Sequence, residues 1–280
     1  MVRISIASGK GGTGKTLVAT NLAAVAADAL LVDLDVEEPD CYLFFDGKEL
    51  SREVVSRKVP FVNKKKCTGC GNCAKVCEYH AIVSLPNDVL VFDELCHSCG
   101  ACSRFCPEGA IEERDHPMGE IIRLGANGLR GLTYGRLRVG EASAATLIKR
   151  VKSQLPKDGL TIIDCPPGTA CPTVESMRGS DLCVLVTEPT PFGLHDLKLA
   201  LAVTKKLRLP HVVLVNKTGL PGPNIREFCS ENRLPIVGEI PLRREIAETY
   251  SEGRLLVRDL GLKRQFESML ERIMEEAEKA

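Results

Sequence analysis

The chain has 280 residues, a formal net charge of zero and 44% hydrophobic residues, with few aromatic residues and no tryptophan. The balanced charge disfavours nucleic acid and anionic membranes as partners, and the scarcity of aromatic rings disfavours a stacking surface for single strands. We find no apolar stretch long enough to cross a bilayer and no apolar core of a signal peptide at the N-terminus. We therefore expect a cytoplasmic protein whose cysteines stay reduced and serve as metal ligands.

The first half of the chain contains two predicted strands and then an irregular region. A β-branched run at 2–7 leads into a glycine-rich loop and an alanine-rich helix, and a second buried strand at 30–35 ends in two acids. Residues 36–60 are polar and lose any periodicity, so no element is predicted there. A cysteine-rich segment spans about 61–115, and two short glycine-rich strands lie between it and residue 140.

The second half alternates between strands and helices. Strands are predicted at 160–164, 182–187, 212–216 and 236–240, and helices at 143–154, 193–207, 223–232, 242–251 and 262–279. Continuous apolar strands separated by amphipathic helices predict an α/β fold with a doubly wound, mostly parallel sheet. The carboxyl ends of such strands lie at one edge, where ligands bind. The last helix has an apolar face and mixed charges, which favours packing on the sheet over binding to a membrane.

A glycine-rich loop follows the first strand directly and precedes the first helix. The loop reads Gly9-Lys10-Gly11-Gly12-Thr13-Gly14-Lys15-Thr16 and fits the pattern G-x4-G-K-[ST]. Its glycines let successive backbone N–H groups turn towards phosphates, and the helix N-terminus adds positive potential. We expect Lys15 to reach the β- and γ-phosphates and the Thr16 hydroxyl to bind Mg²⁺.

Eight of the thirteen cysteines lie in two runs with the spacing C-x2-C-x2-C-x3-C, and the second run follows the first by 29 residues. This spacing suits cubane [4Fe–4S] clusters, because three cysteines of a run bind one cluster and the fourth reaches the other. The predicted ligand sets are Cys67, Cys70, Cys73 and Cys106 for one cluster, and Cys77, Cys96, Cys99 and Cys102 for the other. Zinc and a disulfide framework are weaker alternatives, since zinc sites use paired C-x2-C motifs with a longer gap. The segment looks like a bacterial two-cluster ferredoxin.

The early lysine in K-G-G-x-G-K-T makes the loop a deviant Walker A motif, and in this the chain resembles the MinD/ParA/Mrp class of P-loop ATPases. The resemblance implies that Lys10 crosses to the phosphates of a partner subunit in a homodimer formed around two ATP molecules. A solvated lysine beside the loop is the alternative. The run Val32-Asp33-Leu34-Asp35 resembles the switch I segment of this class. By this resemblance Asp35 orients the attacking water, and Asp33 is a supporting or Mg²⁺-linked acid.

Two further segments resemble motifs of the same class. The run from Ile162 to Thr169 matches D-x-P-P-G-T, which implies that Asp164 holds Mg²⁺ through water and that Gly168 lies where the γ-phosphate is sensed. Asn216-Lys217 ends a strand where this class reads the base. Gly219 stands where a GTPase would have aspartate, so ATP is the expected nucleotide.

The other cysteines divide into core residues and two candidates for a third cluster. Cys183 and Cys229 are expected to pack in the core, and the sequence gives no preference for Cys41. Cys171 follows Asp164 by seven residues, the offset of a bridging cluster ligand in the related nitrogenase iron protein. A third cluster bridged between subunits by Cys165 and Cys171 is therefore considered.

Together these patterns predict a P-loop ATPase domain over 1–60 and 116–280 with a two-cluster ferredoxin-like domain inserted at 61–115. Expected cofactors are ATP, Mg²⁺ and two [4Fe–4S] clusters. The first functional hypothesis is ATP-gated electron transfer, from a homodimer to an unknown redox protein. The alternative is a carrier or scaffold for assembling iron–sulfur or other metallocofactors.

Overall fold

The computed structural model describes residues 1–279, and within them the longest strands form one twisted nine-stranded sheet. Its order is β11-β10-β9-β1-β8-β2-β7-β6-β3, in which the seven strands from β11 to β7 are parallel and β6 and β3 are antiparallel. The bounds are β1 Val2–Ala7, β2 Leu30–Asp33, β3 Gly47–Val62, β6 Ile111–Ala126, β7 Gly131–Leu137, β8 Leu160–Asp164, β9 Leu182–Thr187, β10 His211–Thr218 and β11 Ile236–Pro241. The parallel part confirms the predicted fold class.

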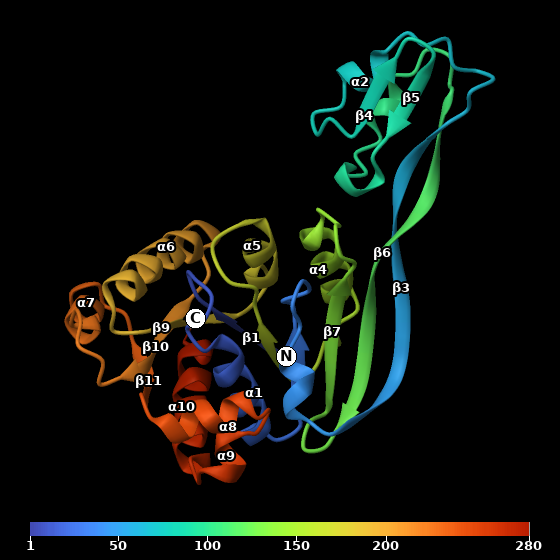
Figure 1. Ribbon diagram of the computed structural model, residues 1–280. Coiled ribbons are helices and arrows are strands. Elements are labelled where there is room, and N and C mark those ends of the chain that lie inside the picture. The colour runs from blue at the N-terminus through green and yellow to red at the C-terminus, as the bar shows by residue number, and fades with distance from the viewer. Residues whose placement is uncertain (280) are drawn as a thin grey trace.

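Helices cover both faces of the sheet (Figure 1). One face carries α1 Lys15–Val25, α8 Arg244–Ser251, α9 Leu256–Asp259 and α10 Lys263–Glu278, and the other carries α4 Ala144–Ser153, α5 Cys171–Met177, α6 Pro191–Leu207 and α7 Ile225–Glu231. Each face has its own buried apolar cluster, which explains why the central strands are apolar throughout. Phe266 and Ile273 of α10 are fully buried, so this helix packs on the sheet as predicted. Among the described helices none combines the length and apolarity that a bilayer span requires.

The edge of the sheet is a long pair of antiparallel strands, β3 and β6, of which the sequence predicted only part of β6 as a short strand. β3 and β6 have sixteen residues each and stay paired from Gly47 opposite Ala126 to Val62 opposite Ile111. The first half of β3 is exposed, and the alternating burial of its second half includes the buried Arg57, so the sequence shows no apolar alternation there. A short 3-10 helix, η1 Cys41–Phe44, joins β2 to this pair. The interpretation of 36–60 as irregular was therefore wrong.

Residues 63–110 form a small unit beyond the far end of β3 and β6 (Figure 1). It contains α2 Asn72–Lys75, β4 Ile82–Leu85, β5 Asp88–Val91, the 3-10 helix η2 Asp93–Leu95 and α3 Ala101–Arg104. Only Cys73, Ile82 and Ile111 form its buried apolar cluster, with several partly buried neighbours. Such a small core gives little hydrophobic stabilisation by itself.

A buried ion-pair network fastens this unit to the body of the protein. Arg57 of β3 donates from Nε and Nη2 to one carboxylate oxygen of Glu141, at 2.9 and 2.8 Å, and both side chains are 3% exposed. The same guanidinium donates to the backbone carbonyl of Asp93 in η2. His116 of β6 lies 2.7 Å from the other Glu141 oxygen. Because Glu141 belongs to the loop between β7 and α4, this loop of the body is linked through Arg57 to Asp93 of the small unit.

Candidate nucleotide site and cysteine clusters

The phosphate loop lies between β1 and α1 at the carboxyl edge of the sheet. Gly12 and Gly14 have φ values of 74° and 95°, and Gly14 is the N-cap of α1. A Cβ atom on Gly14 would lie 2.3 Å from Nδ2 of Asn216, so only glycine fits this position. Lys15 is buried beside the loop with 7% of its surface exposed. The loop therefore has the predicted form, with its backbone close to the first turn of a helix.

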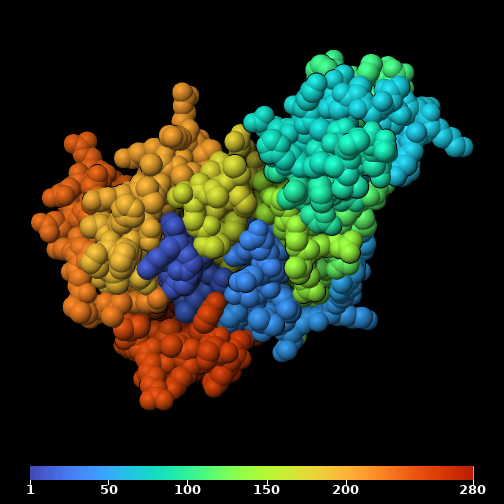
Figure 2. Space-filling view, turned by 45° about the horizontal axis from the view of Figure 1, so that its top comes forward, coloured from blue at the N-terminus to red at the C-terminus, as the bar shows by residue number. Residues whose placement is uncertain are grey.

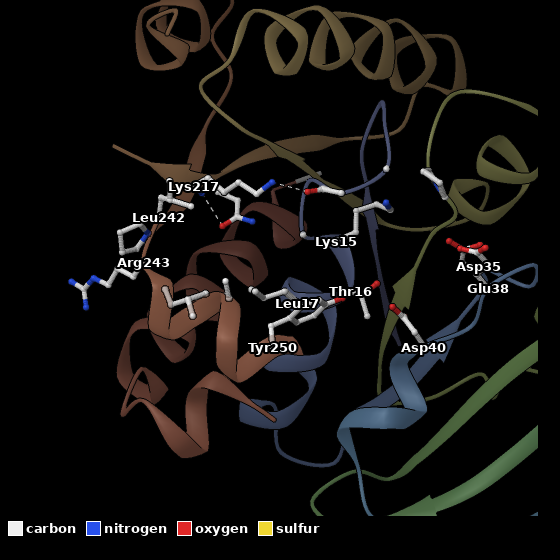
Figure 3. Close-up of a pocket in the computed structure, with 18 residues that line it drawn as sticks. Lys15, Thr16, Leu17, Asp35, Glu38, Asp40, Lys217, Leu242, Arg243 and Tyr250 are labelled. Atoms are coloured by element: carbon white, nitrogen blue, oxygen red, sulfur yellow. Dashed lines mark hydrogen bonds between the residues drawn. The ribbon is translucent and has the colours of Figure 1, made fainter. Parts of the chain in front are cut away.

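A cavity of about 350 Å³ opens over this loop (Figure 3). Asp35, Glu38 and Asp40 line one side, and Leu242, Arg243 and Tyr250 line the other, with Lys15 and Thr16 between them. Further lining residues are Gly11, Gly12, Gly14, Leu17, Pro167, Asn216, Lys217, Pro241, Ile246 and Ala247. A basic loop with acids on one side and an apolar wall on the other matches a phosphate group, its metal ion and a base.

Thr16 lines the cavity, and the buried Asp164 behind it completes a pair that suits Mg²⁺. Thr16 donates from Oγ1 to Oδ2 of Asp164 at 2.7 Å, while the buried Oδ1 of Asp164 has no hydrogen-bond partner among the described residues. Burial raises the pKa of Asp164 to about 7, because water no longer stabilises its charge. A hydroxyl and an unpaired carboxylate oxygen are hard ligands that fit a magnesium ion.

Asp33 supports the following loop instead of facing the cavity. Its Oδ1 accepts from the backbone N–H of Asp35 at 3.0 Å, and its Oδ2 accepts from those of Asp40 and Cys41 at 2.9 and 3.0 Å. Burial, and then the charge of Asp164, raises the pKa of Asp33 well above its usual value. Both oxygens are thus occupied, and the geometry favours the supporting role over a magnesium ligand.

Asp35 is the predicted water-orienting acid, and it lies at the wall of the cavity near Lys15 (Figure 3). Burial raises its pKa to about 6, against the opposing effect of the Lys15 charge. Asp40 lines the same wall, and burial also raises its pKa. One ligand atom from each of Asp33, Asp40, Cys41 and Asp164 lies within 4.8 Å of the others. Asp33 and Asp164 are buried in this cluster, so their negative charges are costly unless protons or a cation neutralise them.

Lys10 lies on the outer side of the loop and contacts a glutamate that follows β9. Its Nζ donates to Oε1 of Glu188 at 2.6 Å, and Lys217 donates to Oε2 of the same carboxylate at 2.9 Å. Lys217 also donates to the backbone carbonyl of Gly12 at 2.8 Å. The predicted solvated alternative for Lys10 does not describe this state, because its ammonium is held in an ion pair.

Asn216 braces the phosphate loop. Its Nδ2 donates to the backbone carbonyl of Thr13 at 2.7 Å, and its Oδ1 accepts from the N–H of Lys217. The residue is 4% exposed, so both halves of the amide are already used. Asn216 also lines the cavity, and the expectation that it reads the base stays a prediction. Gly168 has a φ of 89° and donates its N–H to the carbonyl of Ser8 at 3.1 Å, which ties the second motif to the loop.

The eight cysteines of the small unit surround two separate hollows. One hollow is lined by Cys67, Cys70, Cys73 and Cys106. The other is lined by Cys77, Cys96, Cys99 and Cys102. These are the two sets expected from the spacing, in which the fourth cysteine of each run crosses to the other set.

The backbone around these hollows repeats with the same offset of 29 residues as the cysteines. The N–H groups of Ala81 and Ala110 each donate to the sulfur of the cysteine four residues earlier, both at 3.3 Å. The left-handed residues also pair at this offset, as Gly69 with Ser98, Gly71 with Gly100, and His80 with Gly109. Ser98 and His80 adopt this conformation without being glycine, which indicates that the local fold demands it.

The remaining cysteines separate into buried and exposed positions. Cys183 and Cys229 are buried in the core, as predicted. Cys165 is also fully buried in the apolar cluster under α4 and α5, whereas Cys171 is exposed at the start of α5. A ligand shared between two subunits must reach the surface, so the suggested pairing of Cys165 with Cys171 in a bridging cluster is wrong for Cys165. Cys41 is buried, and its thiol lies 3.5 Å from Oδ2 of Asp164.

Sequence reasoning missed Glu188, Asp40 and Tyr250 as residues of the site. Glu188 directly follows β9, at the edge where ligands bind, and this position was the one available signal for it. Asp40 lies in the polar stretch after β2 that carried no pattern. Tyr250 is on α8 and reaches the cavity only because that helix folds back under the loop.

Comparison with known proteins agrees with this geometry. The sequence profile of the CbiA family, described as the CobQ/CobB/MinD/ParA nucleotide binding domain, matches residues 4–257. An uncharacterised protein of Methanocaldococcus jannaschii is 33% identical over 249 residues, which cover 86% of this chain and 87% of the relative. A second uncharacterised protein of that organism is 28% identical, with 96% of each chain covered.

Solved structures share the fold at lower identity. The cell division ATPase MinD of Pyrococcus furiosus has a TM-score of 0.60 and 21% identity, with 98% of each chain covered. The septum site-determining protein MinD of Pyrococcus horikoshii, solved with Mg-ADP, has a TM-score of 0.60 and 20% identity, with 97% of this chain and 95% of that chain covered. The profile spans most of the length, and the phosphate loop has the expected form. The chain therefore belongs to the CobQ/CobB/MinD/ParA family of nucleotide-binding domains.

Proposed function

We propose that this protein is an ATPase that binds two [4Fe–4S] clusters in the unit formed by residues 63–110, and that its nucleotide state controls electron transfer to a partner protein. The observation that carries the proposal is the arrangement of the cysteines, because each predicted set of four lines its own hollow. We further propose that this unit is a ferredoxin-like domain inserted into the ATPase domain, with its boundaries at the far ends of β3 and β6.

The residues present fit the clusters. Cys67, Cys70, Cys73 and Cys106 would hold one, and Cys77, Cys96, Cys99 and Cys102 the other. When bound, such clusters store and transfer single electrons, at potentials set partly by hydrogen bonds to their sulfurs. The N–H groups of Ala81 and Ala110 are positioned to make such bonds to Cys77 and Cys106. Complete ligation by protein thiolates suits electron transfer better than release of a cluster.

The nucleotide chemistry is assigned to the residues around the cavity. Lys15 and the loop N–H groups would bind the phosphates, while Thr16 and, through water, Asp164 would hold Mg²⁺. Asp35 would orient the attacking water once its carboxyl group has lost its proton. Lys10 would reach the phosphates bound by a second copy of the chain, which makes the active form a homodimer. The wall formed by Leu242, Arg243 and Tyr250 would contact adenine.

Two physical connections join the nucleotide site to the cysteine unit. Asp35, Glu38 and Asp40 line the cavity and lie in the segment that continues through η1 into β3. Glu141, at the carboxyl edge of the sheet, contacts Arg57 and His116 at the base of the unit. A nucleotide-dependent movement of either segment would change how the unit stands relative to a docking partner.

The alternative function is a carrier or scaffold for iron–sulfur or other metallocofactor assembly. That role needs a labile cluster at a surface shared by two subunits. Cys165 is enclosed in the core, and Cys171 alone is exposed in this region, so the alternative has less support than electron transfer.

Metal analysis of protein purified without oxygen tests the proposal. We expect about eight iron and eight sulfide per chain and the broad visible absorbance of [4Fe–4S] clusters. Cys73→Ser and Cys102→Ser should each remove one cluster, whereas Cys229→Ser, which changes a cysteine outside the unit, should leave the iron content unchanged. Stoichiometric zinc in place of iron, or loss of both clusters only when Cys229 is changed, would contradict it.

A further inference from the structure

The lysine expected to act in a second subunit is held within its own subunit by an acid outside every recognised motif. Glu188 accepts hydrogen bonds from Lys10 at 2.6 Å, from Lys217 at 2.9 Å and from the hydroxyl of Thr190 at 3.2 Å. The Glu188 side chain is 8% exposed, while those of Lys10 and Lys217 are 32% and 34% exposed. An anchored acid therefore holds two lysines that still reach solvent.

The charges around Glu188 are arranged so that one lysine can leave. A buried carboxylate that lost its only cation would be strongly unfavourable. Burial acts to raise the pKa of Glu188, but the hydrogen bonds from Lys10 and Lys217 outweigh it and lower the pKa below its usual value. Lys217 is tied to the loop through the carbonyl of Gly12, so it would remain with Glu188 after Lys10 had moved.

We propose that Glu188 is a positioning residue that holds Lys10 in the free subunit and releases it when two ATP-loaded subunits meet. This inference rests on the proposed homodimer in which Lys10 reaches the partner's nucleotide. In the free subunit Lys10 pairs with Glu188, and in the dimer it pairs with phosphate oxygens of the second ATP. Each dimer thus requires two such exchanges. Gly11 and Gly12 of the phosphate loop are exposed, and the N-terminal part of the chain (darkest blue in Figure 2) reaches the surface of the body, where a second subunit could reach Lys10.

The ion pair between Lys10 and Glu188 competes with dimer formation, so its strength predicts how far Glu188 weakens the dimer. A partly exposed ion pair of this kind shifts an equilibrium by about threefold, so two released lysines correspond to about tenfold in the dimer dissociation constant. Glu188 thereby sets the protein concentration at which ATP produces dimers. Without it, Lys10 would be free in every subunit, and ATP would produce dimers at a lower subunit concentration.

Sedimentation velocity with Mg²⁺ and a non-hydrolysable ATP analogue tests this proposal in the full chain. We compare wild type, Glu188→Gln, Lys10→Ala and the double variant. The matched control is Glu239→Gln, which removes a carboxylate paired with Arg226 at 2.7 Å away from the loop. We expect Glu188→Gln to lower the dimer dissociation constant by about tenfold and Glu239→Gln to leave it unchanged. In the Lys10→Ala background the change at Glu188 should have no effect.

The outcomes separate the inference from the function on which it rests. If wild type dimerises through Lys10 but Glu188→Gln dimerises equally or less well, the positioning role of Glu188 is wrong. If wild type does not dimerise, the homodimer itself is wrong. If Lys10→Ala dimerises as well as wild type, the dimer does not depend on Lys10. The inference about Glu188 falls in both cases. Should Glu188→Gln not fold, Glu188→Asp keeps the charge for Lys217 but shortens the reach to Lys10. The proposal then requires Glu188→Asp to lower the dimer dissociation constant.

Discussion

Asp164→Asn should make the nucleotide-free protein more stable while removing its response to Mg²⁺. The carboxyl group is 1% exposed, and its pKa is about 7 in the folded protein against 3.8 for the ordinary group. A pKa raised by folding means that the proton helps stability at low pH, and that this help is lost as the pH rises through about 7. The difference corresponds to about 4 kcal/mol at pH 7.5, at about 1.4 kcal/mol for each pH unit.

The amide should recover much of this free energy. Its oxygen can still accept from Thr16, and its new donor would lie next to the carboxylates of Asp33 and Asp40. We expect unfolding free energy to rise by about 2–4 kcal/mol at pH 7.5, or by on the order of 5–10 °C in Tm. The gain should be smaller at pH 5, where Asp164 of the wild type is already protonated.

Urea denaturation followed by circular dichroism measures this effect, since the chain has no tryptophan. Samples at pH 5 to 8 contain a chelator and no nucleotide. Addition of Mg²⁺ and ATP should then stabilise the wild type more than the variant, because the ligand binds only the folded state. An Asp164→Asn protein that is less stable than wild type at pH 7.5, or equally dependent on pH, would show that the reasoning on this buried charge is wrong.

Three further predictions concern the acid that orients water, the junction and the cysteine unit. Because burial raises the pKa of Asp35 to about 6, the rate of ATP hydrolysis should decline as the pH falls through 6. Asp35→Asn should lower the rate at pH 7.5 by at least about 100-fold without preventing dimer formation. A flat pH–rate profile from 5 to 8 would exclude this role of Asp35. Glu141→Gln leaves the buried Arg57 without a carboxylate and should destabilise the junction between the body and the cysteine unit by about 3 kcal/mol. Hydrogen exchange in β3 and η2 should then be faster, whereas Glu53→Gln, in the more exposed pair with Arg150, should have little effect. Equal exchange in both variants would contradict the estimate. Iron-free protein should be cleaved by protease within 63–110 while the rest resists, because the unit has so small an apolar cluster; a resistant unit without iron would refute this dependence.

The local motifs were predictable from sequence because their chemistry depends on neighbours in the chain. The phosphate loop is fixed by glycines between Gly9 and Gly14, and the two cysteine sets follow from short spacings repeated at 29 residues. The parallel sheet was likewise visible in its apolar strands. In contrast, β3 and β6 support each other over sixteen residues at an exposed edge, so their stability comes from pairing that no periodicity reports.

The missed features depend on contacts between distant parts of the chain. The pairing of Lys10 with Glu188 joins residues 178 positions apart, and neither sequence neighbourhood predicts it. Asn216 was placed correctly at the site, but its contact with Thr13 was not predicted, because it is visible only in three dimensions. Cys165 shares its sequence motif with residues of the cavity but is buried in the core. This burial, which the sequence did not reveal, excludes Cys165 as a ligand of a cluster shared between subunits.

The midpoint potential of the iron–sulfur clusters, measured with and without Mg²⁺ and a non-hydrolysable ATP analogue, tests the coupling of nucleotide to redox chemistry most directly. We predict that the nucleotide shifts this potential in the wild type and leaves it unchanged in Lys10→Ala, because the shift requires the homodimer. Equal potentials with and without nucleotide, in a wild-type holoprotein shown to bind ATP and dimerise, would contradict the account.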